Sequence, residues 1–291
     1  MFAQFLQFLF SGITVGAAYA LAALGFAIIY NTSGVINFAQ GEFIMLGGMF
    51  ATALLAAGLP LPLAIALAII ATGVAGLALE KLAIEPARNA DVLTLLIITI
   101  GASLTIRGLI QVWLGKGNHA LPAFSGETPI QIMGARLLPQ SLWVLGVALV
   151  IVLILGWFFG KTLLGKAMLA TSYNKLAAQL VGVNTKVILL LSFGLSAVLG
   201  AVGGIILAPI TYTSYDVGIM LGLKGFVAAV LGGLGGGVGA IAGGLILGIA
   251  EAMAAGYISS AYKDAVPFVL ILLILFFRPA GLFGAKATER V

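Results

Sequence analysis

Long stretches of this chain carry no charged side chain at all. These stretches cover residues 1–41, 43–79, 137–160, 187–215 and 225–250. A helix that crosses a bilayer needs about 20 mostly apolar residues, and a soluble core rarely contains several such runs. Only 8% of the 291 residues are charged, whereas a soluble domain has about 25%. The pattern predicts an all-α, polytopic transmembrane helical bundle, and it excludes an ordinary soluble enzyme and a disordered chain.

The residue totals narrow the chemistry that the chain can perform. It contains no Cys and a single His, His119, so disulfides, thiolate metal sites and a metal cluster held by several His residues are excluded. We therefore expect neither a cofactor nor a metal. The formal net charge of +5 is typical of basic residues gathered in the cytoplasmic loops of a membrane protein. The lipid bilayer is thus the expected partner, and nucleic acid is not.

Eight spans are predicted from the apolar runs. They cover residues 5–30, 35–57, 61–79, 92–113, 142–159, 187–208, 238–256 and 265–277. A ninth segment, 218–237, is short and interrupted by glycines. It is either a Gly-broken crossing, of the kind that lines cavities in transporters, or a tight turn outside the membrane.

The distribution of Lys and Arg favours the crossing, because basic residues accumulate on the cytoplasmic side of membrane proteins. With loop 160–186 in the cytoplasm and a crossing at 218–237, nine basic residues lie inside and four, Lys224 among them, lie outside. The inner group includes Lys286 and Arg290. Without that crossing the split is seven to six. The prediction is a chain with its N-terminus outside the cytoplasm and its C-terminus inside.

The segment 160–186 is the longest polar stretch between spans, and part of it has helical periodicity. Apolar side chains form one stripe on a helix at Tyr173, Leu176, Ala177, Leu180 and Val181. The opposite face carries Asn174, Lys175, Ala178 and Gln179. We expect a single amphipathic helix over 172–181, capped by Thr171 or Ser172 and ended by Gly182. It either lies among lipid headgroups or presents apolar anchors to a cytoplasmic partner; its single Lys favours the partner.

Three motifs resemble the LivH-type permeases of branched-chain amino acid ABC importers. The first resembles their cytoplasmic coupling loop and consists of Gly165 to Ala170, Asn174, Ala177-Ala178 and Gly182-Val183-Asn184. The second is Asn37-Phe38-Ala39-Gln40-Gly41-Glu42, in the second predicted span. The third is Arg278 to Gly284 near the C-terminus. Together with the Gly-rich run 230–239, the resemblance covers essentially the whole chain.

The resemblance implies a single transmembrane permease domain over 1–291 that does not hydrolyse ATP itself. It implies two cytoplasmic ATPase subunits, a periplasmic substrate-binding protein, and either a paralogous permease as a heterodimer partner or a second copy of the chain. It also implies multi-pass insertion in a bacterial inner membrane and import of leucine, isoleucine or valine; urea, short amides and other amino acids are alternatives. Contact with the ATPase would involve Gly165, Ala170, Tyr173, Asn174, Leu176, Ala177, Leu180 and Gly182.

Polar side chains inside the predicted spans are candidates for the translocation path. Glu42 lies beside Asn37 and Gln40 in an otherwise apolar run, and a charge near the bilayer centre costs roughly 2.5–3.5 kcal/mol on insertion scales. These three residues either line the path or form a polar knot between helices; an ion-coupled carrier using Glu42 is a less favoured alternative. Arg107 is expected to extend toward the outer surface, and Glu251 to pair with Arg107 or with a helix end.

Overall fold

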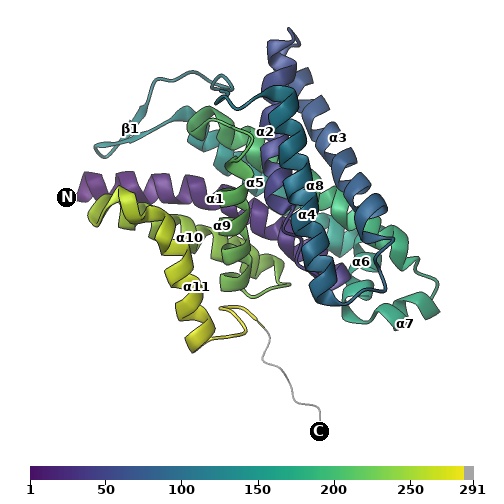
Figure 1. Ribbon diagram of the computed structural model, residues 1–291. Helices are drawn as coiled ribbons and strands as arrows, with labels where there is room; N and C mark the ends of the chain where they lie inside the picture. Colours follow the sequence, from purple (N-terminus) through teal and green to yellow (C-terminus); the bar gives the residue numbers. More distant parts are fainter. Residues whose placement is uncertain (285–291) are drawn as a thin grey trace.

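The computed structural model describes residues 1–284, and this part of the chain is almost entirely helical (Figure 1). Lys286 and Arg290, which entered the charge count, lie outside the described residues. The helices are α1 (Phe2–Ser33), α2 (Gln40–Ala56), α3 (Leu61–Leu79), α4 (Val92–Leu114), α5 (Pro139–Lys161), α6 (Leu163–Tyr173), α7 (Lys175–Leu180), α8 (Thr185–Thr211), α9 (Val217–Gly232), α10 (Gly237–Tyr257) and α11 (Val266–Phe277).

Short elements complete the described chain. A π-helical turn η1 (Glu80–Ile84) extends α3, and a 3-10 turn η2 (Ser260–Ala265) precedes α11. The strands β1 (Ile130–Ile132) and β2 (Ala135–Leu137) form an antiparallel hairpin, with Gln131 opposite Arg136. Seven helical segments are long and apolar enough to cross a membrane, and α2 and α9 are shorter apolar helices. The predicted all-α, polytopic architecture is confirmed.

Helix α1 forms the centre of the bundle, and glycines allow its neighbours to approach it closely. In the most apolar 18-residue stretch of α1, 89% of the residues are buried. A Cβ on Gly248 of α10 would lie only 2.4 Å from the Gly16 Cα of α1. On the other side of the core, a Cβ on Gly204 of α8 would lie 1.9 Å from the Ile44 carbonyl oxygen of α2. Small residues at these crossings let the backbones touch, as is common between membrane helices.

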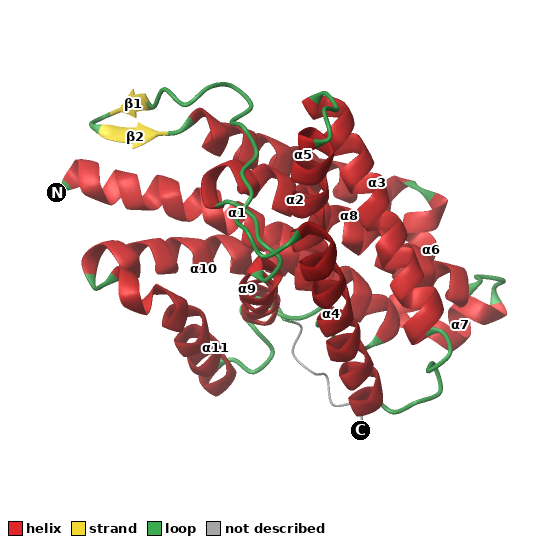
Figure 2. Cartoon of the chain, turned by 45° about the horizontal axis from the view of Figure 1, so that its top comes forward, coloured by secondary structure: helices red, strands yellow, loops and turns green. Residues whose placement is uncertain are grey.

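The ends of the helices gather at two opposite ends of the molecule (Figures 1 and 2). At the hairpin end, Gln7 of α1 bonds to the Arg136 backbone, and Phe8 packs against Tyr257 of α10. At the other end, which includes α6 and α7 and which we name the α7 end, Asn31 bonds to the Gly235 carbonyl oxygen. The tail also reaches this end, where Leu282 N donates to the Leu231 carbonyl oxygen.

Helix α9 runs between these two ends, as a crossing at 218–237 requires. The residues that precede it are tied to the hairpin end, since Thr213 pairs with His119 of the loop before the hairpin. Its last residues contact the tail at the α7 end. The helix is unbroken over Val217–Gly232, and the glycine run forms the turn to α10, where Gly233 and Gly235 have φ of 99° and 100°. The glycine break therefore lies at the end of the short helix and not within it.

Two details of the predicted spans are corrected. The predicted span 35–57 is helical only from Gln40, because Gly34 ends α1 with a left-handed φ of 72° and residues up to Ala39 form a turn. Lys224, counted among the outer basic residues, lies inside α9 and is 6% exposed. Lys224 was counted among the outer residues because its ion-pair partners, Glu251 and Asp264, are distant in sequence, and no local pattern indicates that it is buried.

A buried ion-pair network holds Lys224 in place. Its Nζ lies 2.6 Å from Glu251 Oε1 of α10 and 2.7 Å from Asp264 Oδ1 of η2. The Tyr19 hydroxyl of α1 donates to Glu251 Oε2 at 2.8 Å. Glu251 therefore pairs with Lys224 and Tyr19 and not with Arg107. The network ties α9 to α1, α10 and η2.

Candidate functional site

The predicted amphipathic helix consists of two consecutive helices, α6 and α7. Asn174 separates them and caps α7, because its side-chain Oδ1 accepts a hydrogen bond from Ala177 N at 3.0 Å. The Thr171 and Ser172 hydroxyls donate to carbonyl oxygens within α6 instead, so neither caps α7. Gly182 has a φ of 90° directly after α7, as predicted. The prediction of one helix with a Thr or Ser cap was wrong, because an Asn at the cap position competes for the same backbone N–H groups.

Apolar side chains of α6 and α7 point away from the rest of the chain. Tyr173, Leu176, Leu180 and Val181 are 88%, 73%, 89% and 80% exposed, and we name these four residues the apolar patch. Ala178, predicted on the polar face, is buried and anchors α7 to the bundle. Large apolar side chains that are exposed together mark either an interaction surface or a lipid contact.

The other predicted coupling residues have different surroundings. Gly165 is buried against α5, and a Cβ there would lie 2.1 Å from the Phe158 carbonyl oxygen. The lack of a side chain at Gly165 therefore allows α6 to pack closely against α5. Ala170 is half-buried, and Asn174, Ala177 and Gly182 are exposed. The sequence motif therefore combines residues that shape the α6–α7 segment with residues that lie on its surface.

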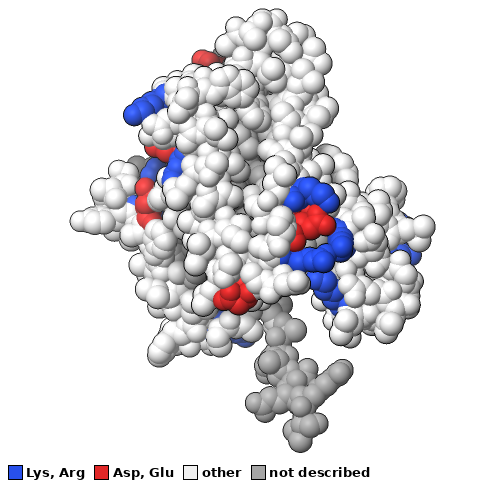
Figure 3. All heavy atoms as spheres, turned by 45° about the vertical axis from the view of Figure 1, so that its right-hand side comes forward, with Lys and Arg blue, Asp and Glu red and all other residues white. Residues whose placement is uncertain are grey.

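Basic side chains lie beside this segment at the start of α8 and after α3. Lys81 forms an ion pair with Glu85 at 2.6 Å. The hydrogen bond from Lys81 lowers the pKa of the Glu85 carboxyl, and Lys186 and Arg88 act in the same direction. Figure 3 shows such a mixed cluster of basic and acidic side chains on a surface with few other charged groups. Three basic side chains and one carboxylate therefore lie close together beside the α6–α7 segment.

Two of the three predicted path residues, Asn37 and Gln40, make contacts that hold helices and turns together. Asn37 Oδ1 accepts from Ala39 N at 3.1 Å and shapes the turn before α2. Gln40 Nε2 donates to the Ser196 carbonyl oxygen at 3.2 Å, and the Ser196 hydroxyl lies 2.5 Å from Gln40 Oε1. Ser196 also bonds to the Gly25 carbonyl oxygen. Gln40 thus links α2 to α8 and, through Ser196, to α1.

The third predicted path residue, Glu42, lies at the wall of a cavity. The cavity has a volume of about 190 Å³ and lies between α2, α4 and α9. Ser103 Oγ of α4 donates to Glu42 Oε1 at 2.8 Å, whereas Glu42 Oε2 has no hydrogen-bond partner among the described residues. Arg107, which was expected to extend toward the outer surface, lines the same cavity. No local sequence pattern pointed to Ser103 or to Gly218 and Gly222 of α9, which also line this cavity.

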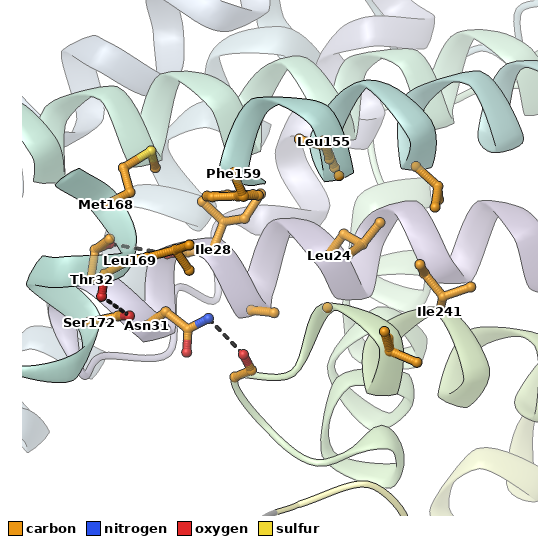
Figure 4. A pocket seen from close by; sticks show the side chains of 16 residues that line it. Leu24, Ile28, Asn31, Thr32, Leu155, Phe159, Met168, Leu169, Ser172 and Ile241 are labelled. Atoms are coloured by element: carbon orange, nitrogen blue, oxygen red, sulfur yellow. Dashed lines mark hydrogen bonds between the residues drawn. The ribbon is translucent and has the colours of Figure 1, made fainter. Parts of the chain in front are cut away.

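A second cavity, of about 280 Å³, lies at the α7 end (Figure 4). It is lined mainly by apolar side chains of α1, α5, α6 and α10, including Leu24, Phe159 and Ile241. Its polar groups are engaged within the chain: Asn31 Nδ2 donates to the Gly235 carbonyl oxygen at 2.7 Å, and Ser172 donates to the Leu169 carbonyl oxygen. The lining contains no charged residue. This cavity is suited to apolar contacts.

These features define a class: a polytopic helical membrane protein with an apolar patch at one end and a buried carboxylate beside a cavity. The family of branched-chain amino acid transport system permease components matches residues 8–275. The chain is 34% identical to the high-affinity branched-chain amino acid transport permease LivH of Escherichia coli K12, over 100% of this chain and 99% of that protein. It is 35% identical to BraD of Pseudomonas aeruginosa, over 99% and 98%. The chain belongs to this family of permease components.

A more distant likeness concerns the fold alone. The structure of PsaBC from Streptococcus pneumoniae in complex with Fab matches with a TM-score of 0.53 and 15% identity, over 96% of this chain and 97% of that chain. Family membership makes this chain the non-catalytic, membrane-spanning component of an ABC transport system. It implies ATPase and substrate-binding-protein partners in general terms.

Proposed function

We propose that this chain forms part of the translocation pathway of an ATP-driven importer for leucine, isoleucine and valine. Its similarity to LivH and BraD over nearly the full length of each chain supports this class of substrate. The pathway is completed by a second permease subunit, a paralogue or a second copy, and two ATPase subunits bind on the cytoplasmic side. A periplasmic binding protein delivers the amino acid to the outer face.

The proposed orientation puts the hairpin end outside and the α7 end in the cytoplasm of a bacterial inner membrane. The N-terminus is then periplasmic, and the described end of the tail is cytoplasmic. The cluster of Lys81, Arg88 and Lys186 near the α7 end supports this orientation, because basic residues are enriched on the cytoplasmic side.

The single observation that carries the proposal is the exposure of the apolar patch on α7 and at its two ends. Leu176 and Leu180 are 73% and 89% exposed, yet Asn174, Ala178 and Gly182 fix the conformation of the helix that bears them. A short helix with fixed ends and exposed apolar anchors is suited to a groove on a partner protein. A movement of the ATPase subunits would then be transmitted through α6 to α1 and α5, which α6 contacts.

The test is the double substitution of Leu176 and Leu180 by Asp. Buried apolar anchors at an interface are each worth about 2 kcal/mol or more, so the variant is expected to insert normally while losing copurification of the ATPase and ATP-dependent leucine uptake. The control is Met133→Asp, which introduces one Asp where the double variant introduces two, at a residue that is 76% exposed in the hairpin turn. Normal ATPase copurification with the double variant would show that the docking assignment is wrong.

A further inference from the structure

We propose that the cavity beside Glu42 binds the two charged ends of an α-amino acid zwitterion, with Glu42 contacting the ammonium group and Arg107 contacting the carboxylate. The inference rests on the proposed function, because it concerns the solute that the permease moves. It adds a binding site within the membrane-spanning part, with a role for each charged residue.

The environment of Glu42 supplies the first part of the argument. Glu42 is 1% exposed, and Ser103 satisfies only its Oε1. The Oε2 atom has no donor among the described residues. A buried carboxylate oxygen without a donor is costly. An ammonium group would supply a charge-assisted hydrogen bond at this position.

Arg107 supplies the second part. It follows Ser103 by one helical turn, so both side chains lie on the same face of α4. Arg107 lines the cavity together with Glu42, but it belongs to none of the three ion pairs in the described part of the chain. A carboxylate and a guanidinium therefore share one cavity without a direct contact. The guanidinium group is well suited to bind a carboxylate with two parallel hydrogen bonds.

The shape of the cavity fits a small aliphatic solute. Gly218 and Gly222 of α9 lie on one wall, and a Cβ on Gly218 would lie 2.9 Å from Glu42 Oε2. Because Gly218 has no side chain, the backbone of α9 lies close to this unpaired oxygen, which is itself buried. The remaining lining is largely apolar: Phe38, Ile100, Leu104, Ile219 and Leu223. The volume of about 190 Å³ is below the 300–1,000 Å³ or so of pockets for drug-sized ligands.

The larger cavity in Figure 4 does not offer this chemistry, because no charged residue lines it. The cavity at Glu42 is thus the better candidate for a zwitterion. A site on a transport path has to release its solute as readily as it accepts it, so we expect weak binding with selectivity for both charged groups.

Ligand-detected NMR on the purified full-length chain in detergent tests the site without the other subunits. The probes are L-leucine, 4-methylpentanoate, which lacks the ammonium group, and 3-methylbutylamine, which lacks the carboxylate. Wild-type chain is expected to bind leucine at least tenfold more tightly than either analogue. Glu42→Gln should weaken leucine binding at least tenfold without changing the binding of 4-methylpentanoate. Arg107→Gln should weaken leucine binding without changing the binding of 3-methylbutylamine.

Conservative and control variants separate this pattern from a folding defect. Arg107→Lys keeps the positive charge and should restore part of the leucine affinity. Thr105→Val, on the exposed side of α4 where Thr105 bonds only to the Gly101 carbonyl oxygen, should bind all three probes as the wild type does. Equal binding of leucine by wild type, Glu42→Gln and Arg107→Gln, or no leucine binding by the wild type, would overturn the site.

Leucine uptake by the reconstituted complex of permease, ATPase and binding protein separates this inference from the proposed function. If the wild-type complex imports leucine but the two Gln variants import it at the same rate, the site is wrong and the proposed function stands. If the wild-type complex does not import leucine, the proposed function fails, and the binding pattern on the isolated chain still decides the site. The expected result is import by the wild type and at least tenfold slower import by each Gln variant.

Discussion

Replacing Lys224 by Met removes the only cation of the buried network formed by Tyr19, Lys224, Glu251 and Asp264. Glu251 is 7% exposed and would keep only the Tyr19 hydroxyl as a partner. Removing one member of a buried ion pair costs about 3–5 kcal/mol, because the remaining charge stays desolvated. We expect a loss of this size in the free energy of unfolding for Lys224→Met.

The same reasoning predicts how substitutions of the other network members rank by their loss in the free energy of unfolding. The Asp264 side chain is 49% exposed, so water can solvate it and Asp264→Asn should cost at most about 1 kcal/mol. Glu251→Gln leaves Lys224 with Asp264, and the Gln oxygen can still accept from Tyr19, so a loss of about 1–3 kcal/mol is expected. Combining Lys224→Met with Glu251→Met removes both buried charges and should be less destabilising than Lys224→Met alone.

The assay is SDS-induced unfolding of the detergent-solubilised chain, followed by the fluorescence of its three Trp residues. Lys263→Met is the control, since Lys263 is exposed beside Asp264 and forms no ion pair in the described part of the chain. The reasoning is refuted if Lys224→Met destabilises the chain no more than Asp264→Asn does. It is also refuted if the double variant is less stable than Lys224→Met.

Two further predictions concern packing and local helix structure. Gly204→Ala should destabilise the chain by about 1–3 kcal/mol or more, because its Cβ would lie 1.9 Å from the Ile44 carbonyl oxygen. Gly101→Ala is the control and should be tolerated, because a Cβ there has nothing within 4 Å. Similar unfolding curves for the two variants would contradict this prediction. Asn174→Ala should loosen α7 by about 1 kcal/mol through the lost cap, measured as faster amide hydrogen exchange at Ala177 with unchanged exchange in α8. Unchanged exchange at Ala177 would argue against the cap.

The positions of the long helices could be predicted from the sequence, because a helix that crosses a membrane requires an apolar run of sufficient length. The predicted span 61–79 coincides with α3, and 92–113 differs from α4 by one residue at its end. The end of α7 at Gly182 was also predicted, since a left-handed residue after a helix favours glycine. These features depend on local composition and backbone conformation.

One error arose where residues distant in sequence decide the structure, and another where a local cap signal was passed over. Lys224 is bonded to side chains 27 and 40 residues away, and no local pattern indicated that it is buried in α9. The start of α7 was misplaced because the apolar stripe was extended back to Tyr173, although Asn174 before a helical run is itself a cap signal. The spacing of Ser103 and Arg107 on one face of α4 is a signal that could have directed attention to Glu42.

The cavity at Glu42 could not be derived from the sequence, because three separate helices form it. Gly218 and Gly222 lie on the cavity wall because α9 packs closely against the start of α2, where a Cβ on Gly41 would meet the Gly218 carbonyl oxygen. Gln40, close in sequence to Glu42, points instead to Ser196 of α8. Adjacent polar residues in one motif thus have different surroundings.

Site-specific crosslinking tests the central claim, that α7 docks an ATPase, most directly. The chain has no native Cys, so a single Cys at Leu180 gives an unambiguous attachment point for a short crosslinker. Leu153→Cys, on α5 and 63% exposed, is the control for a membrane-spanning surface. We expect the Leu180→Cys chain in native membranes to crosslink to the ATPase subunit and the control not to do so. Crosslinking of Leu180→Cys to lipid alone, or to a protein on the periplasmic side, would contradict the account.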